Sequence, residues 1–598
     1  MKNTMHKILL LTILSAAFSL ALANNITVTN GSLTGRDDVN HFVLVKFTVG
    51  WENSWRASTP PNNIDAAWIF VKYKINGNYV SAAGATSSST TIMVTSTASL
   101  RVGMPVAVTA GSGAFAAGTV VTAITNGTTF TVSAVPSTGL SGGASVVTGY
   151  AIWQHTTINT IGYTAPSGSI ITPASDGTGA CIYRSTYGNS TFTAADAQLR
   201  WNYGANGLSD IAMVDIKVFA IEMVYVSTGS FTVGTGGTEI GSFSKGTWSS
   251  GAPIPFSIAS ENALTVEYMT GDLWYISSDY SGDHAGPIPA AFPKGYSAFY
   301  CMKYEISQQQ YVDFLNTLTY TQQTTRTVNA PSSVAGTAAM FNVNAYDYSY
   351  RNGIDIMTPG VSSSTPAVYG CNLDGNVTAG ETADGQNIAC NHVCWADVAA
   401  YLDWSGLRPM TELEYEKACR GTMAAVPNEY AWGTTGIASL EYTLSNSGAA
   451  NEVILTNYNI NVGNADYGAT TQNGTVIDGP VRAGIFAGTS GNSGRVTAGA
   501  TYYGIMEMSG NLLELTVTVG HSAGRAFTGT HGNGALDAAT GNADVSNWPG
   551  TNAAGSGFRG GSWYFDAPYL QVSDRKTAAM AEPSRDREIG GRGVRLAP

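Results

Sequence analysis

Hydrophobic and polar residues alternate along the N-terminal part of the chain. The period of two is clearest over residues 42–47, and it resumes from Tyr150 to about Val214. Gly, Asn and Pro interrupt these runs at short intervals, which is typical of short β-strands. Residues 24–83 and 149–215 together predict one all-β sandwich that is discontinuous in sequence.

Between these stretches, residues 84–148 are rich in Thr, Ser, Ala, Gly and Val, and Arg101 is their one charged residue. Alternating runs at 90–94 and 128–132 predict a small inserted β module. Uncharged strands lack the protection that Lys or Glu gives to a sheet edge. One interpretation of the module is a plain spacer. The alternative is an adhesive or glycosylated unit that pairs with another subunit.

Helical periodicity begins only beyond residue 300. Ser307 and Gln310 form a capping-box pattern, and apolar residues follow from Tyr311 at i, i+3, i+4 and i+7. This predicts a helix over residues 307–318. The same signals predict two more helices, over residues 395–404 and 411–421. The Gly/Asn/Thr-rich stretches beyond them predict long ordered loops, which turns, hydrogen bonds or metal ions must fix.

The composition narrows the functional classes. The chain has 598 residues, 12% of them charged, with a formal net charge of −12. This length predicts about three to five domains. The low charge excludes a coiled coil and a charged disordered chain. The acidic balance, without a basic patch, excludes a nucleic-acid partner.

The N-terminus predicts export. Lys2 and Lys7 precede an apolar run from Ile8 to Leu22, which ends in a small-x-small pattern at Ala23. The run is short for a membrane span, so we predict a signal peptide over residues 1–23, cleaved after Ala23. The alternative is an uncleaved anchor. We expect a secreted or cell-surface protein with no membrane span after cleavage.

The six cysteines permit disulfides in an exported chain. Cys371 and Cys390 bracket a Gly/Asn/Asp-rich loop, and we predict a disulfide between them. Cys394 and Cys419 lie in helical patterns and are predicted to be buried thiols. A zinc site is not expected, because no second pair matches the spacing of Cys390 and Cys394.

The bracketed loop mimics an EF-type calcium loop in the pattern Asn372-x-Asp374-x-Asn376-x-Thr378. With Asn372 in the first place, the twelfth place holds Ala383 rather than an acid, and Glu381 comes two places early. We therefore interpret the loop as a turn held by the predicted disulfide, with bound calcium as the alternative.

Six strings in the C-terminal part of the chain occur in the order found in one known family. They are residues 220–226 with 229–234, 302–307 with 311–316, 395–397 with Tyr401, 406–409 with 411–421, 503–514, and 559–563 with 572–575 and 593–595. In these strings, residues 216–598 resemble the formylglycine-generating (sulfatase-modifying factor) enzyme domain. The resemblance implies an α+β fold of the C-type lectin class, with a small twisted antiparallel sheet, two or three helices and abundant loops.

The resemblance also marks a difference from the family's enzymes. Its aerobic members bind copper and attack their substrate through two cysteines that follow a Gly-Gly-Ser sequence. Counted from Gly560-Gly561-Ser562, these positions hold Phe565 and Leu570, and no cysteine follows Cys419. Neither side chain offers the thiolate that Cu(I) requires. We expect no copper and no formylglycine-generating activity.

Another branch of the family uses iron, which directs attention to the histidines. His521 and His531 share one loop region with Asp537 and Asp544. These residues are a hypothetical facial triad for iron. The alternative is that they make ordinary loop hydrogen bonds.

Structural calcium is the cofactor that the resemblance implies. Its ligands would be the side chains of Glu507 and Glu514 with the carbonyls of Gly510 and Leu512, and a second ion would use Asn464 with the carbonyl of Ala465. Two carboxylates beside a tight turn suit calcium, which takes six to eight hard oxygen ligands. The alternative is a pair of surface glutamates beside a hairpin.

These observations lead to three functional hypotheses. The first is an exported, non-catalytic protein that binds an extracellular ligand, a glycan or a protein, at the cell surface. Its binding surface would lie in residues 563–588, where the predicted contact residues are Trp563, Tyr564, Phe565, Tyr569 and Arg575. The second is a structural subunit of an extracellular filament, sheath or layer that assembles through the β modules. The third is a metal-dependent oxidoreductase of the same family with a replaced active site.

Overall fold

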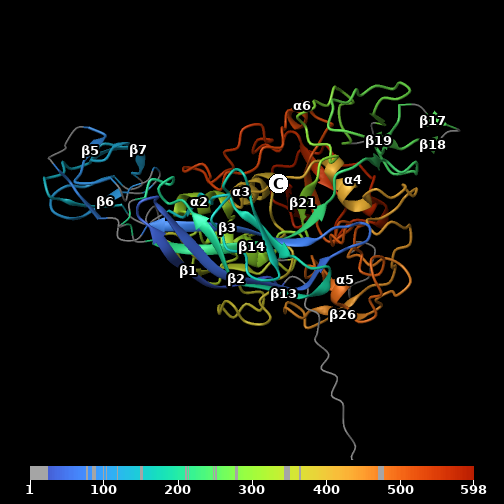
Figure 1. The fold of residues 1–598 in the computed structure, drawn as a ribbon, viewed down its shortest axis with the longest axis horizontal. Helices are drawn as coiled ribbons and strands as arrows, with labels where there is room; N and C mark the ends of the chain where they lie inside the picture. Colours follow the sequence, from blue (N-terminus) through green and yellow to red (C-terminus); the bar gives the residue numbers. More distant parts are fainter. Residues whose placement is uncertain are drawn as a thin grey trace, which may run out of the picture.

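The computed structural model describes residues 25–597 except for 76–78, 84–88, 98–99, 101, 103, 105, 117–118, 149–151, 209, 211, 213, 247, 250–251, 277–279, 343–349, 362–364 and 469–476. The predicted signal peptide lies outside the described residues. The regular structure is mostly β, with few and short helices (Figure 1). Among the described residues, no helix combines the length and the apolar character needed to cross a membrane.

An eight-stranded sheet connects the N-terminal and C-terminal parts of the molecule. Along the sheet the strands are β11 (Ser169–Pro173), β12 (Ala180–Arg184), β3 (Asp65–Ile75), β14 (Val214–Val226), β21 (Phe299–Met302), β30 (Gly593–Leu596) and β24 (Arg408–Pro409), and β10 (Gln154–His155) pairs with β3. The β3–β14 pair is antiparallel and runs from Val214 opposite Ile75 to Val224 opposite Asp65. The boundary predicted between residues 215 and 216 therefore lies inside β14. The eight-stranded sheet therefore extends across the predicted boundary.

A second sheet of three strands covers the N-terminal part of the first. Its order is β1 (Thr27–Asp37), β2 (Phe42–Arg56) and β13 (Gly188–Trp201). β2 buries every second residue from Val43 to Trp51, in line with its alternating sequence. These side chains form one core with Ile69, Val71 and Tyr73 of β3. The strands expected to form a separate sandwich thus share a layer with the C-terminal domain.

The inserted module has its own small core. Its two sheets are β4 (Tyr79–Ser81), β9 (Ser145–Thr148) and β6 (Val106–Ala110), and β5 (Thr91–Met93), β8 (Thr129–Val132) and β7 (Val121–Asn126). Ile92, Phe130 and Leu140 are fully buried in the module's core. Strands β5, β6 and β7 lie together at one end of the molecule, far from α4 and β19 (Figure 1, blue).

Three predicted helices are present. They are α1 (Gln308–Leu315), α3 (Trp395–Trp404) and α4 (Glu412–Arg420). Ser307 caps α1 in a capping box with Gln310, and Thr411 caps α4 in a capping box with Glu414. Both caps satisfy backbone N–H groups that the first helical turn leaves free. The cap residues therefore fix where α1 and α4 begin.

The remaining elements are short and are joined by long loops. The helices are α2 (Tyr320–Arg326), α5 (Ile485–Gly488), α6 (Ser522–Arg525) and the 3-10 helix η1 (Ala567–Leu570). The strands are β15 (Phe231–Val233), β16 (Phe243–Ser244), β17 (Trp248–Ser249), β18 (Ala252–Pro253), β19 (Phe256–Ile258), β20 (Trp274–Tyr275), β22 (Ile354–Thr358), β23 (Val368–Cys371), β25 (Thr443–Ser445), β26 (Val453–Thr456), β27 (Leu513–Val517), β28 (Ser556–Arg559) and β29 (Ile589–Gly590). β27 lies between β28 and β29 in a three-stranded sheet.

A buried ionic cluster links β3, β14 and the residue after β21. Lys303 Nζ lies 3.0 Å from Glu222 Oε2 and 3.8 Å from Asp65 Oδ2. Asp65 also accepts hydrogen bonds from Trp51 Nε1 at 2.8 Å and Ser54 Oγ at 2.9 Å, both of β2. Burial would lower the pKa of Lys303, but Glu222 and Asp65 hold it above its ordinary value. One ammonium thus pairs with two buried carboxylates, one from each part of the chain.

Replacing Lys303 by Met should destabilise the part of the molecule that is built on the eight-stranded sheet. The change leaves Asp65 and Glu222 buried without a cation, and breaking a buried ion pair from one side costs about 3–5 kcal/mol. Denaturant unfolding followed by intrinsic fluorescence measures the loss. In the control Lys46→Met, which removes an exposed pair with Asp196, the change should stay below about 1 kcal/mol. A loss as small for Lys303→Met would contradict the assigned role.

Candidate functional site

The segment that follows β28 presents a strip of aromatic rings. We call Tyr564, Phe565 and Tyr569 the aromatic strip, and all three are partly exposed. The ring centroids of Phe565 and Tyr569 lie 4.9 Å apart, and those of Tyr564 and Phe565 lie 6.2 Å apart. Aromatic rings at these separations contact one another and supply large contact areas with few rotatable bonds.

Two cations flank the aromatic strip. Lys576 Nζ lies 4.9 Å from the centroid of the Tyr569 ring and donates a hydrogen bond to its hydroxyl at 2.6 Å. The Arg587 guanidinium lies 4.8 Å from the Tyr564 ring and 4.6 Å from the Tyr350 ring. Such separations place both cations within reach of the ring faces. The strip therefore combines aromatic rings with a basic side chain at each end, and Arg587 also pairs with Glu588 at 3.5 Å.

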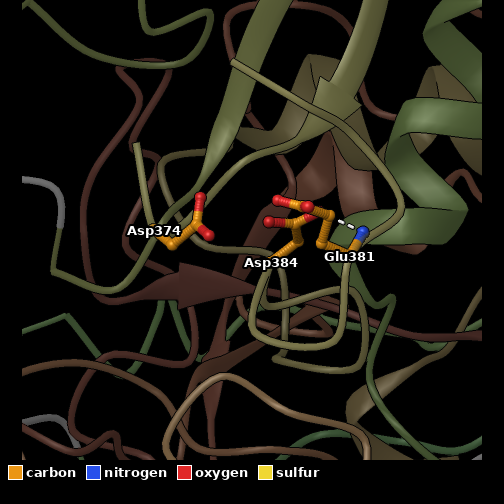
Figure 2. Close-up of side chains that lie close together, drawn as sticks. All are labelled: Asp374, Glu381 and Asp384. Carbon is orange, nitrogen blue, oxygen red and sulfur yellow. Dashed lines mark hydrogen bonds between the residues drawn. The ribbon is translucent and has the colours of Figure 1, made fainter. Parts of the chain in front are cut away.

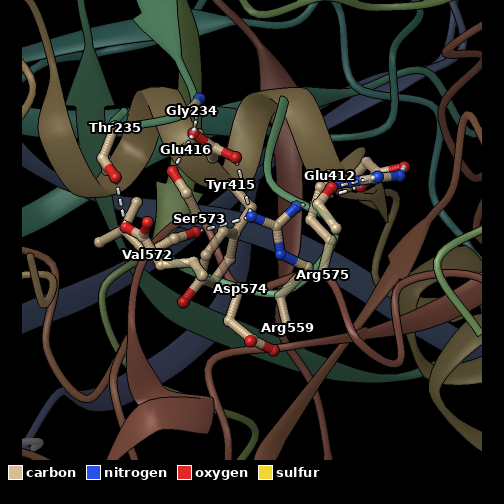
Figure 3. Close-up of polar contacts among 12 residues, drawn as sticks. Gly234, Thr235, Glu412, Tyr415, Glu416, Arg559, Val572, Ser573, Asp574 and Arg575 are labelled. Carbon is tan, nitrogen blue, oxygen red and sulfur yellow. Dashed lines mark hydrogen bonds and ion pairs between the residues drawn. The ribbon is translucent and has the colours of Figure 1, made fainter. Parts of the chain in front are cut away.

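A buried ionic network fixes the segment that carries the strip (Figure 3). Its acids are Glu412 and Glu416, one turn apart on α4. Arg575 donates to both carboxylate oxygens of Glu412, at 2.6 and 3.0 Å. Arg559 Nη2 lies 2.9 Å from Glu416 Oε1, and Ser573 Oγ donates to Glu416 Oε2 at 2.9 Å. One helix thus holds residues on both sides of the aromatic strip.

The network is shielded from water, and Glu429, which pairs with Arg420, gives it three carboxylates for three arginines. All of its charged side chains, including Arg420 on α4, are almost fully buried. Burial would raise the pKa of Glu412, but Arg575 and Arg559 hold it below its ordinary value. Glu412 therefore remains a carboxylate, and its bidentate pair with Arg575 also has geometric specificity.

Two of the five predicted contact residues do not lie on the surface. Arg575 is fully buried in the network, and Trp563 is 1% exposed. The Trp563 ring packs between Tyr350 and Tyr564, with centroids 5.3 and 5.7 Å away. These two residues support the aromatic strip from behind. Lys576 and Arg587, which we did not predict, take the cationic positions beside the strip and are partly exposed.

The two positions that the family resemblance assigns to catalytic cysteines have different surroundings. Phe565 belongs to the aromatic strip. Leu570 is fully buried, in a cluster with Tyr430, Trp432 and Ala465. Neither side chain carries an atom that could act as a nucleophile. The nearest cysteine in sequence, Cys419, is buried on α4, and burial raises its thiol pKa to about 12.

The predicted calcium ligands at the Gly510 turn fit a cation only in part. Glu507 and Glu514 are buried, and each has one carboxylate oxygen without a hydrogen-bond partner. However, the Arg592 guanidinium pairs with the other oxygen of Glu514 and already brings a positive charge to the turn. Glu507 accepts a hydrogen bond from Gly484 N at 3.0 Å, and burial raises its pKa to about 7. Calcium at this turn stays a prediction.

The second predicted calcium site offers no free side-chain oxygen. Asn464 Oδ1 accepts hydrogen bonds from Tyr442 Oη at 3.0 Å and from Asn459 N at 2.9 Å. Its amide nitrogen donates to the carbonyls of Asn459 and Thr497. The neighbouring Ala465 is buried in the cluster around Leu570. Asn464 is therefore engaged in holding its loop.

The histidines and aspartates of the hypothetical iron site are not brought together. His521 caps α6, where its Nδ1 accepts from Ala523 N at 3.1 Å. His531 Nε2 accepts from the backbone N–H of Leu596 at 3.0 Å. Asp537 closes its own turn with Thr540, and Asp544 accepts from Asn533. Each makes local contacts, and among the described residues these four do not form a metal cluster.

The predicted Cys371–Cys390 disulfide is absent from this structure, in which all six cysteines are free and buried. Burial raises the thiol pKa of both residues above the ordinary value. The loop between them is therefore not held by a disulfide here.

A comparison with protein-family models agrees with the resemblance. The family model described as "Sulfatase-modifying factor enzyme 1-like domain" matches residues 220–597. No curated protein matches the chain. Among solved structures, the chain is similar to "Treponema denticola variable protein 1", with 12% sequence identity and a TM-score of 0.28, over 63% of this chain and 96% of that chain.

Replacing Glu412 by Gln should destabilise the fold by about 3–5 kcal/mol at pH 7, because Arg575 and Arg559 lose a shared buried carboxylate. The Glu412 pKa is depressed in the folded state. Its stabilising contribution is therefore complete above the unfolded value of about 4.3 and is lost as the pH falls through the folded value. The difference in the free energy of unfolding between wild type and the variant should become smaller below about pH 4. Urea unfolding of both proteins across this pH range measures that difference.

The matched control is Glu267→Gln, at an exposed glutamate. It should leave stability within about 0.5 kcal/mol of wild type. A Glu412→Gln loss no larger than that of the control, or a gap that widens with acid, would contradict the role of the network.

Proposed function

The chain belongs to the family of sulfatase-modifying factor enzyme 1-like domains, and we propose that it is an exported, non-catalytic member that binds an extracellular partner through the aromatic strip. In this proposal the domain keeps the C-type lectin fold that the family resemblance implies. The observation that carries the proposal is the set of partly exposed rings of Tyr564, Phe565 and Tyr569, flanked by Lys576 and Arg587, on a segment anchored to α4.

The non-catalytic part of the proposal rests on chemistry that is missing from the sequence. Phe565 and Leu570 stand where the resemblance places a pair of thiols, and no cysteine follows Cys419. A phenyl ring and an isobutyl group can neither bind Cu(I) nor attack a thiol. The position of one lost cysteine has instead become part of the aromatic strip.

The strip's chemistry favours an anionic partner that also has apolar faces. Rings such as those of Tyr569 and Phe565 stack on sugar rings or on flat apolar side chains. Lys576 and Arg587 would pair with carboxylates or sulfates beside those faces. We propose an acidic glycan of the cell surface as the partner class, with an acidic protein surface as the other extracellular option.

The double variant Phe565→Ala/Tyr569→Ala should lower the affinity for an acidic glycan by at least about tenfold, because hot-spot aromatic residues each contribute about 2 kcal/mol or more. The probes are immobilised polygalacturonate and sulfated dextran, with neutral dextran beside them. Surface plasmon resonance at two salt concentrations gives the affinities. Binding to the acidic glycans should weaken as the salt concentration rises.

The control is Tyr268→Ala, at a tyrosine that is 57% exposed outside the strip. It should leave the affinity unchanged. Equal binding by wild type and the double variant, or no binding of wild type to either acidic glycan, would refute the proposed partner class.

A second candidate function is that of a structural subunit that assembles through the inserted module. The edge strands β5 and β7 contain no charged residue, and Met93 and Ile124 on them are 56% and 36% exposed. Uncharged edge strands are open to pairing with another chain.

If the module drives assembly, Ile124→Lys should abolish filaments or sheets, since a lysine on an edge strand opposes strand addition. Electron microscopy and sedimentation of the purified mature chain at high concentration provide the measurement. Val135→Lys, at a loop residue that is 47% exposed, is the control and should assemble like wild type. A wild-type chain that remains monomeric would exclude this function.

A further inference from the structure

Three acidic side chains converge in the loop between β23 and α3. They are Asp374, Glu381 and Asp384, and one carboxylate oxygen from each lies within 4.8 Å of the other two. Figure 2 shows the Asp384 and Glu381 carboxylates close together, with Asp374 beside them. This acidic loop, residues 372–384, is distinct from the aromatic strip and from the Gly510 turn.

The acidic loop has no basic counter-charge among the described residues. No lysine, arginine or histidine there forms an ion pair with any of the three carboxylates. The contact that bridges two of them is the neutral amide of Asn376, whose Nδ2 donates to Asp374 Oδ2 at 2.9 Å and also to Glu381. An amide hydrogen carries only a partial charge, so the carboxylates' mutual repulsion is largely uncompensated.

Asp384 provides an independent indication of a ligand. Its side chain is fully buried, and its Oδ2 accepts a hydrogen bond from Glu381 N at 2.6 Å. Its Oδ1 is also buried and has no hydrogen-bond partner. A buried carboxylate oxygen without a partner is costly unless a cation meets it. This oxygen belongs to a carboxylate that faces the other two acids (Figure 2).

We propose that the acidic loop binds one calcium ion through Asp374, Glu381 and Asp384. The three side-chain ligands are oxygens, which suit a hard cation and disfavour copper or zinc. Several closely spaced carboxylates on a loop suit calcium better than magnesium, which demands a tighter octahedral shell and keeps more of its water.

The loop's conformation explains why the sequence pattern was misaligned. Gly375 has φ +74°, the left-handed conformation of the glycine at the sixth place of an EF-type loop. With Gly375 in that place, Asp374 takes the fifth and Glu381 the twelfth, where such loops carry their glutamate. The numbering therefore begins at Gly370 rather than Asn372. The first place lacks a side-chain ligand, and Asp384 supplies a carboxylate from beyond the twelfth.

The ion would join parts of the domain that are distant in sequence. Asn372 donates through its backbone N–H to Gly353 O at 2.7 Å, and Gly385 donates to Gly448 O at 2.9 Å. Gln386 and Ile388, just after the loop, accept hydrogen bonds from the first residues of α1. Calcium that orders the acidic loop would thereby stabilise the domain by ligand linkage.

Isothermal titration of the chelator-treated full chain with CaCl₂ tests the proposal. Wild type should bind calcium in the acidic loop with a dissociation constant of about 10⁻⁴–10⁻³ M or tighter, typical of extracellular modules. Asp384→Asn and Asp374→Asn should each weaken that binding by at least about tenfold, since each removes a charged ligand. Glu507→Gln/Glu514→Gln, at the Gly510 turn, should leave it unchanged.

Thermal unfolding with and without calcium separates a lost ligand from a lost fold. Asp374 is exposed, so Asp374→Asn should melt like wild type without calcium and lose only the calcium-dependent rise. Two bound ions in wild type, with one lost in the Asp374 and Asp384 variants, would also support the proposal. No calcium binding by wild type at about 5 mM, well above this affinity range, would overturn it. Calcium binding that is lost only in Glu507→Gln/Glu514→Gln, and is kept in the Asp374 and Asp384 variants, would also overturn the proposal.

Discussion

The C-terminal part of this chain depends on the two glutamates that α4 points into its interior. Glu412 and Glu416 meet Arg559 and Arg575, which come from the two sides of the aromatic strip. The segment between those arginines contains one short 3-10 helix and no strand. With so few backbone hydrogen bonds of regular structure, ion pairs with fixed geometry supply the positional constraint. A segment held in this way can display partly exposed rings without collapsing onto the core.

A second constraint acts through the sheet. β14 pairs with β3 along eleven residue positions and with β21 at its far end, so N-terminal strands extend the sheet of the family domain. At this junction Lys303 pairs with one acid from each part. The inserted module has its own core at one end of the molecule. The molecule is thus a composite scaffold with a separate module attached.

Local signals were sufficient to predict several elements. The capping residues Ser307 and Thr411 indicated the starts of α1 and α4, and the alternation in β2 indicated its buried face. Helix α2 was missed, although Thr319 and Gln322 form a capping box, because no apolar stripe follows them. The pairing of β14 with β3 was not predicted, because a strand shared by two regions has the same alternating pattern as a strand confined to one.

The site was harder to predict, because burial there is decided by distant partners. Arg575 looked like a surface cation, yet its partner Glu412 lies 163 positions away in sequence. Trp563 is covered by Tyr350 and Tyr564, which a linear pattern does not show. The convergence of Asp374, Glu381 and Asp384 was not predicted, because Asp384 lies outside the EF-type pattern and its burial depends on the fold.

We infer that α4 holds the aromatic strip in place through buried charges. Amide hydrogen exchange over residues 559–588, compared between wild type and Glu412→Gln under native conditions, tests it most directly. We expect the amides of the segment to be protected in wild type and to exchange much faster in the variant, while those of β3 and β14 keep their protection. Equal exchange of the segment in both proteins would contradict it.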